Sequence, residues 1–322
     1  MPLECTEGEA HVALRELLPD DADERTMERC LRWILQPGHH FITRADPRFP
    51  RLLREIADPP AALFALGRLE LLQAECFAIV GSRNATPSGK RDAARFASHL
   101  SARGLCIVSG LALGIDAAAH RGALSQAGSS IAVLGTGADV VYPKENAGLA
   151  AQLADEGCIV TEFPVGTAPR GWNFPKRNRL ISGLSRGVLV VEAALKSGSL
   201  VTAYEALRQD REVFAIPGSI HATLAKGCHA LIRDGAKLVE SADHILEEFP
   251  RWRAAGGEEP PPGPARRTRD PFLEAMGFAP LSVDAIVGLT GLAAADSTAR
   301  LAMLEIEGRV TRLAGGLYQR MP

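Results

Sequence analysis

Short apolar runs alternate with longer segments of helical periodicity between residues 76 and 239. Each run is continuously apolar, as expected of strands that are buried on both faces of a sheet. Helix-length segments separate the runs, so the pattern predicts a series of β-α-β units that build a parallel sheet. The predicted strands are Cys76–Val80, Leu105–Val108, Ser130–Leu134, Cys158–Thr161, Val188–Val191, Val213–Ile216 and Lys237–Val239.

The chain has 322 residues, which leaves room for smaller domains on both sides of this sheet. Residues 1–58 carry apolar side chains at helical spacing, in Val12–Leu18 and Met27–Leu35, and predict a small helical domain of the SAM or helix-hairpin-helix (HhH) type. Residues 59–249 form the sheet domain. Residues 250–270 are rich in proline, glycine and charge, which is typical of a linker.

Residues 271–322 predict a helix capped by Ser282, a turn at Gly291, a second helix over about 293–307 and a closing hairpin over 309–319. This order is that of a winged helix. The second helix is net acidic, which favours a protein contact over a DNA groove. The predicted fold class is α/β, a doubly wound parallel (Rossmann-like) sheet flanked by a small N-terminal helical domain and a C-terminal winged helix.

The composition is that of an ordinary globular protein, with 46% hydrophobic and 23% charged residues and a net charge of −2. No apolar run reaches the roughly 18–20 residues that cross a bilayer. The first residues lack the apolar stretch of a signal peptide, so we expect a cytoplasmic protein without a membrane partner. The six cysteines form no C-x-x-C pair, which favours buried thiols over disulfides or zinc.

Glycine-rich loops follow the predicted strands, and in an open parallel sheet such loops gather along one crevice that binds ligands. Helix starts there offer unpaired N–H groups to anions, and Arg83 can add a bidentate pair of hydrogen bonds to a phosphate. The alternative for Arg83 is a surface ion pair beside a plain turn. The residues predicted to bind phosphate are Gly81, Ser82, Arg83, Ser109, Gly110, Gly114, Gly135, Gly137, Lys144, Lys176, Arg177, Asn178, Arg179, Ser197, Gly198 and Ser199.

Residues 170–179 combine four basic and two aromatic side chains and contain no acidic one. A single strand of nucleic acid needs such a mixture, because cations bind its phosphates and flat rings stack on its bases. The alternative is a solvated helix start with at least one of Trp172 and Phe174 in the core. Asp116 and His120 stand four residues apart, but two ligands make a poor metal site. We therefore favour a loop-holding Asp116 and a packed, hydrogen-bonded His120.

The motifs of several enzyme classes are missing. The chain has no G-x-x-x-x-G-K-[ST] loop for ATP hydrolysis and no G-x-S-x-G nucleophile elbow. The G-x-G of Gly135 and Gly137 lacks a third glycine and follows the third strand, so the dinucleotide fingerprint fails. We expect no catalytic residue, no cofactor and no metal.

Six motifs in order resemble the DNA-processing protein A (DprA/Smf) family: I-V-G-S-R, S-G-L-A-x-G-I-D-x-x-A-H, I-A-V-L-G-T-G-x-D-x-x-Y-P, F-P-x-R-N-R-x-I-S-G-L-S, V-V-E-A-x-x-x-S-G-S-L-x-T-A and F-A-I-P-G-S. The resemblance covers about residues 60–245. It implies a homodimer that binds single-stranded DNA, with Arg83 and Lys144 contacting the DNA, and that loads the RecA recombinase during natural transformation. Some relatives place an aromatic residue three positions after that lysine, where this chain has Ala147.

Two other classes of function stay open. The segment with Glu192 and Ser197 to Ser199 loosely resembles the lysine-decarboxylase-like phosphoribohydrolases, nucleotide-processing enzymes that need an acidic residue, and Glu192 is the candidate. The other class is a scaffold that works through protein surfaces alone.

Overall fold

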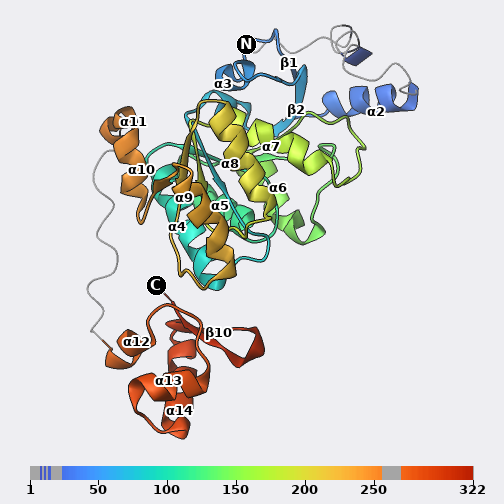
Figure 1. Ribbon diagram of the computed structural model, residues 1–322. Helices are drawn as coiled ribbons and strands as arrows, with labels where there is room; N and C mark the ends of the chain where they lie inside the picture. The colour runs from blue at the N-terminus through green and yellow to red at the C-terminus, as the bar shows by residue number, and fades with distance from the viewer. Residues whose placement is uncertain (1–7, 9–10, 12–13, 16–23, 256–269, 322) are drawn as a thin grey trace. The chain divides into compact units, whose positions relative to one another are not determined.

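The computed structural model describes residues 8, 11, 14–15, 24–255 and 270–321. The chain divides into two compact units, Met1–Gly257 and Glu258–Pro322 (Figure 1). The helix predicted over Val12–Leu18 falls largely outside the described residues. None of the described helices is long and apolar enough to cross a membrane.

The first unit is built on a nine-stranded sheet with the order β1-β2-β6-β5-β4-β3-β7-β8-β9. Neighbours are parallel from β6 to β9, which confirms the predicted doubly wound sheet and all of its predicted strands. The strands are β1 (His39–Thr43), β2 (Ala62–Gly67), β3 (Cys76–Val80), β4 (Cys106–Ser109), β5 (Ser130–Val133), β6 (Cys158–Thr161), β7 (Gly187–Val190), β8 (Glu212–Ala215) and β9 (Lys237–Leu238).

Helices cover both faces of the sheet because successive strand side chains point to opposite faces. In β3, Phe77 and Ile79 pack toward α4, α5 and α10, whereas Ala78 and Val80 pack toward α7, α8 and α9. Both sets are buried, which explains why the sequence of β3 is apolar throughout. These helices are α4 (Pro87–Ala102), α5 (Ile115–Leu124), α7 (Asn173–Leu184), α8 (Gly198–Arg208), α9 (Lys226–Arg233) and α10 (Ala242–Glu248).

The N-terminal prediction needs a correction. Residues 1–58 do not form a purely helical domain, because β1 lies between α2 (Glu24–Ile34) and α3 (Arg51–Arg54). It pairs antiparallel with β2, which in turn pairs antiparallel with β6, so the sheet begins before the predicted boundary. Buried Phe41 and Ile42 are the only large apolar residues of β1, too few for a strand pattern to show in the sequence.

The start of the linker is also corrected. Residues 250–255 form α11 (Pro250–Ala255). Trp252 is buried with its ring centroid 4.0 Å from that of Phe249, and both rings lie near Phe77. This aromatic contact holds the segment against the sheet domain, and composition alone did not reveal it. Residues 256–269, the rest of the predicted linker, lie outside the described residues.

The second unit confirms the predicted winged helix. Its elements are α12 (Pro271–Met276), α13 (Val283–Thr290), α14 (Ala294–Ile306) and a hairpin of β10 (Val310–Arg312) and β11 (Tyr318–Arg320). The Ser282 hydroxyl caps α13 by accepting a hydrogen bond of 3.2 Å from the Ala285 N–H. Gly291 ends α13 with a φ of +70°, a left-handed conformation that glycine adopts without strain.

Candidate functional site

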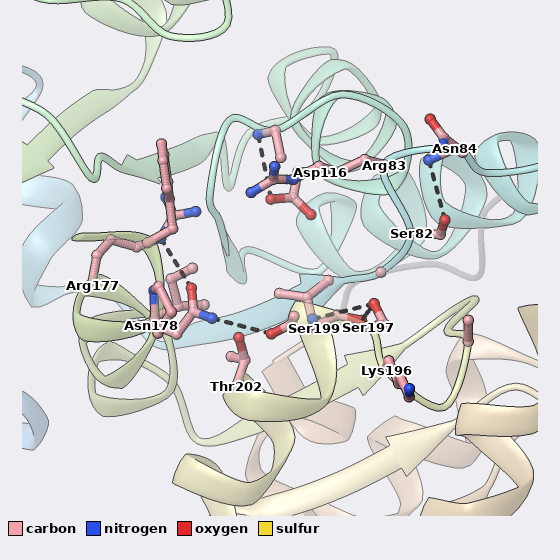
Figure 2. A pocket seen from close by; sticks show the side chains of 18 of the residues that line it. Ser82, Arg83, Asn84, Asp116, Arg177, Asn178, Lys196, Ser197, Ser199 and Thr202 are labelled. Carbon is pink, nitrogen blue, oxygen red and sulfur yellow. Dashed lines mark hydrogen bonds between the residues drawn. The ribbon is translucent and has the colours of Figure 1, made fainter. Parts of the chain in front are cut away.

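The topology of the sheet creates a crevice beside β3. The chain runs outward from β3 through β4 and β5 to β6, and it then returns to place β7 on the other side of β3. Ligands of open α/β sheets bind at the carboxyl ends of the strands at such a switch point. A pocket of about 780 Å³ opens there, lined by the loops after β3, β4 and β7 and by the start of α7 (Figure 2).

The loop after β3 forms one wall of the pocket. The Ser82 N–H donates to the Glu192 carbonyl at 2.7 Å, and the Ser82 hydroxyl accepts from the Asn84 N–H at 3.1 Å. A side chain at Gly81 would lie 2.6 Å from Ile115, so only glycine fits between the loop and α5. Arg83 follows on the surface, and none of the described carboxylates forms an ion pair with it.

The loop after β7 forms the opposite wall. Ser197 caps α8, and its hydroxyl accepts from the Ser199 N–H at 3.3 Å. The two serine hydroxyls lie 2.7 Å apart, and the Asn178 side chain donates to the Gly198 carbonyl at 3.2 Å (Figure 2). The first turn of α8 therefore meets the pocket with the positive end of its helix dipole. Exposed Lys196 adds a cation to this wall.

Asp116 and His120 hold the loop after β4, as predicted. The Asp116 carboxylate accepts from the Gly110 N–H at 3.1 Å and the Ala112 N–H at 3.4 Å. His120 Nε2 accepts from the Leu111 N–H at 3.3 Å, and its Nδ1 lies 2.7 Å from the Ser130 hydroxyl. Burial is the main reason why the pKa of His120 falls to about 3, so the ring is neutral at physiological pH.

Arg177 needs a correction, because its charge serves the interior rather than a ligand. The side chain is 4% exposed, and its guanidinium donates to the carbonyls of Gly110, at 2.8 Å, and Val133. It also donates to the Asn178 side chain at 3.1 Å. Burial lowers its pKa to about 10 against the opposing attraction of Asp116, so the group stays charged at neutral pH. Arg177 is a structural cation at the floor of the pocket.

Arg179 also has internal partners. Its guanidinium forms ion pairs with Glu162 at 2.6 Å and with Asp58 at 2.9 Å. These carboxylates raise the pKa of Arg179 even though burial alone would lower it. The side chain does not line the pocket, and its hydrogen-bonding fork is already occupied. Arg179 therefore joins Arg177 as a predicted phosphate contact that the structure assigns to internal stabilisation.

The predicted residues divide into those that line a cavity and those that do not. Lys144 and Lys176 are exposed outside the pocket lining, with Lys144 opening a short 3-10 turn before α6 (Ala147–Glu156). Gly110 lines a smaller adjoining cavity of about 70 Å³. Those that support the loops without lining either cavity are Ser109, Gly114, Gly135 and Gly137. Those that line the pocket are Gly81, Ser82, Arg83, Arg177, Asn178, Ser197, Gly198 and Ser199.

Two aromatic residues belong to the site. Tyr142 and Phe174 line both cavities, and their ring centroids are 5.5 Å apart. The Arg83 guanidinium lies 5.4 Å from the centroid of Phe174, a cation–π geometry. Tyr142 was not among the predicted site residues, although it precedes Lys144 in the same glycine-rich loop. The expectation that Trp172 or Phe174 lies in the core is wrong, since Phe174 is half-buried and Trp172 is exposed.

Glu192 does not present its carboxylate to the pocket. One oxygen accepts from the Thr86 N–H at 2.9 Å and the other from the Thr86 hydroxyl at 2.6 Å. Burial raises the pKa of Glu192, and the Thr86 hydrogen bonds oppose this shift. A Cβ at Gly89 would collide with the same carboxylate, so α4 packs directly on it. Glu192 thus joins the β7 loop to the start of α4.

No three His, Cys, Asp or Glu side chains cluster in metal-binding geometry within the described residues. The cysteines that the structure describes are all buried and unpaired.

Comparison with known families gives two matches. The family described as DNA recombination-mediator protein A matches residues 40–250, which begin within β1. The family described as DprA winged helix domain matches residues 257–316.

Individual relatives are similar over most of the chain. Protein Smf of Escherichia coli (strain K12) is 42% identical over 305 residues, which cover 92% of this chain and 81% of the relative. DNA processing protein DprA of Streptococcus pneumoniae (strain ATCC BAA-255 / R6) is 47% identical over 204 residues, which cover 63% of this chain and 72% of the relative.

Two solved structures share the fold. The X-ray structure of DNA processing protein A from Streptococcus pneumoniae superposes with a TM-score of 0.65 and 42% identity over 70% of this chain and 78% of that one. DNA processing protein A from Helicobacter pylori, whose structure is described for its single-stranded DNA binding mode, superposes with a TM-score of 0.59. It is 30% identical over 63% of this chain and 93% of that one.

Proposed function

This chain belongs to the DNA recombination-mediator protein A family, and from that premise we propose that it binds single-stranded DNA across the pocket beside β3. The observation that carries the proposal is that the guanidinium of Arg83 is exposed at the pocket wall and makes no ion pair with any described residue. Arg177 and Arg179 nearby are instead occupied by internal partners. An unpaired guanidinium beside two amide-rich loops suits a phosphate.

The strand is held mainly through its backbone. Arg83 and the start of α8 bind phosphates within the pocket, and exposed Lys196 and Lys144 extend the path of positive charge on either side. Because these groups contact phosphate and sugar rather than base edges, the binding is largely independent of sequence. The relative from Helicobacter pylori, whose structure is described for its single-stranded DNA binding mode, supports this choice of ligand.

The test is the salt dependence of binding to a fluorescent single-stranded oligonucleotide, measured by anisotropy. Arg83→Ala should weaken binding and reduce the slope of log affinity against log salt by about 0.7, the value for one lost phosphate contact. Lys144→Ala and Lys196→Ala should each weaken binding and reduce the slope by a similar amount.

Arg208→Ala is the matched control, because Arg208 is exposed at the far end of α8 and pairs with Glu205. Its affinity and slope should equal those of the unsubstituted chain. If Arg83→Ala also leaves both quantities unchanged, the strand does not cross this pocket.

We further propose that the chain acts by binding rather than by catalysis. The phosphoribohydrolase alternative needs an acidic residue at the ligand, and both oxygens of Glu192 are instead occupied by Thr86. Incubation with AMP tests this point, since release of adenine would favour the enzyme.

The bound complex is proposed to load the RecA recombinase on incoming DNA in natural transformation, as a homodimer. The description of the matched family as a recombination mediator supports this role. RecA assembly on a single strand should be faster with the chain present than without it, and light scattering should give the mass of a dimer.

The winged helix is proposed to contact protein rather than DNA. On α14, Arg300 is already paired with Asp270 at 2.8 Å, which leaves the exposed face of this helix acidic. Large apolar side chains are also exposed on α13, α14 and the turn between them, namely Leu289, Leu292, Met303 and Ile306. An acidic and apolar surface suits a protein partner better than a DNA groove.

A further inference from the structure

We propose that Trp172 is a stacking platform for one base of the bound strand, at the rim of the pocket. The inference rests on the proposed single-stranded DNA binding and adds a base contact to a site otherwise built for phosphates.

The exposure of Trp172 is the first observation. The chain has three tryptophans, of which Trp33 and Trp252 are 5% and 7% exposed, whereas Trp172 is 69% exposed. Tryptophan carries the largest apolar surface of any side chain, and folding normally covers most of it. The other two rings pack in cores with neighbouring aromatics. Trp172 instead leaves most of its surface free for a ligand.

The backbone fixes where this ring stands. Trp172 occupies the N-cap position of α7, and the Asn173 N–H donates to the Arg170 carbonyl at 3.0 Å, which closes the turn. Gly171 before it and Phe174 after it both line the pocket. The ring therefore stands on a hydrogen-bonded turn between two residues that line the pocket, at the rim of the proposed phosphate site.

The charges around the ring favour nucleic acid over protein as its occupant. The Arg170 guanidinium lies 5.7 Å from the centre of the Trp172 ring, in cation–π geometry. Exposed Lys176 follows one turn later, and residues 170–179 contain no acid. Cations beside a free aromatic face match the alternating phosphates and bases of a single strand.

The test uses the intrinsic fluorescence of the full chain. Because the other two tryptophans are buried, a base that stacks on Trp172 should quench the exposed part of the emission. Titration with a single-stranded oligothymidylate should therefore reduce the emission, and an abasic strand of equal length and charge should bind without reducing it. In Trp172→Phe, neither strand should change the emission.

Affinity gives a second, independent readout. Trp172→Ala should weaken binding of the thymidylate strand by roughly 5- to 100-fold, the range for one stacked base, and leave the abasic strand unaffected. Trp172→Phe, which keeps a ring, should restore most of the loss.

Equal losses on both strands, or tight binding of thymidylate without quenching, would overturn the stacking role while leaving phosphate binding intact. Failure of the unsubstituted chain to bind either strand would instead refute the proposed function, and the stacking role with it.

Discussion

The most decisive perturbation of the site is Arg177→Met, because it tests whether Arg177 stabilises the fold or contacts DNA. Methionine keeps an unbranched chain, shorter than that of arginine, and donates no hydrogen bonds. The substitution removes the donors to the carbonyls of Gly110 and Val133 and to the side chain of Asn178. It also removes the cation that most favours the charged form of the buried Asp116 carboxylate.

The structure allows the cost to be worked out. Each buried acceptor left without a partner costs about 1–3 kcal/mol, so the two carbonyls together cost about 2–6 kcal/mol. The attraction between the charges of Arg177 and Asp116 adds little to this cost, because among the described residues no ion pair joins the two groups. Water from the pocket can reach part of the vacated space and lower the cost. We therefore expect the free energy of unfolding to fall by about 3–5 kcal/mol.

Urea unfolding followed by tryptophan fluorescence is the appropriate assay, since all three tryptophans lie in the first unit. The matched control is Arg83→Met, which removes an exposed guanidinium and should change the stability by less than about 0.5 kcal/mol. The two variants should differ in the opposite way in their binding to single-stranded DNA. Arg83→Met should reduce the slope of log affinity against log salt, and folded Arg177→Met should leave this slope unchanged. A normal unfolding midpoint for Arg177→Met, combined with a reduced slope, would refute this assignment.

Three further predictions concern the loops and the second unit. Gly114→Ala should lower the free energy of unfolding by about 1–3 kcal/mol and weaken DNA binding, because φ is +80° and a Cβ would collide with the Ser82 carbonyl; an unchanged midpoint in urea would contradict this. Burial raises the folded-state pKa of Glu192, so ionisation costs the native chain stability as pH rises from about 4 through that pKa. In urea titrations, Glu192→Gln should therefore gain stability relative to the unsubstituted chain between pH 4 and pH 7, and a relative loss would reverse the sign. Removing residues 260–322 should leave the affinity for single strands nearly unchanged in anisotropy, and a large loss would assign DNA contact to the winged helix.

Local sequence predicted the sheet well for a physical reason. Strands buried on both faces are apolar at nearly every position, so Cys76–Val80 and Cys158–Thr161 are visible without any knowledge of their neighbours. The antiparallel strand His39–Thr43 was missed because its pairing with β2, rather than its composition, makes it a strand. The helix around Trp252 was missed because it is stabilised by aromatic packing that includes Phe77, a residue far away in the sequence.

The sequence by itself determined where the loops proposed to bind phosphate lie, because glycines, serines and helix caps are local requirements of each turn. Only the tertiary structure decided which cations are available to a ligand. Arg177 donates to a carbonyl 67 positions away in the sequence, and Arg179 pairs with a carboxylate 121 positions away. Arg83 has no such partner among the described residues. A charge is available for binding only when folding brings no internal acceptor to it, and that depends on contacts that the local sequence does not record.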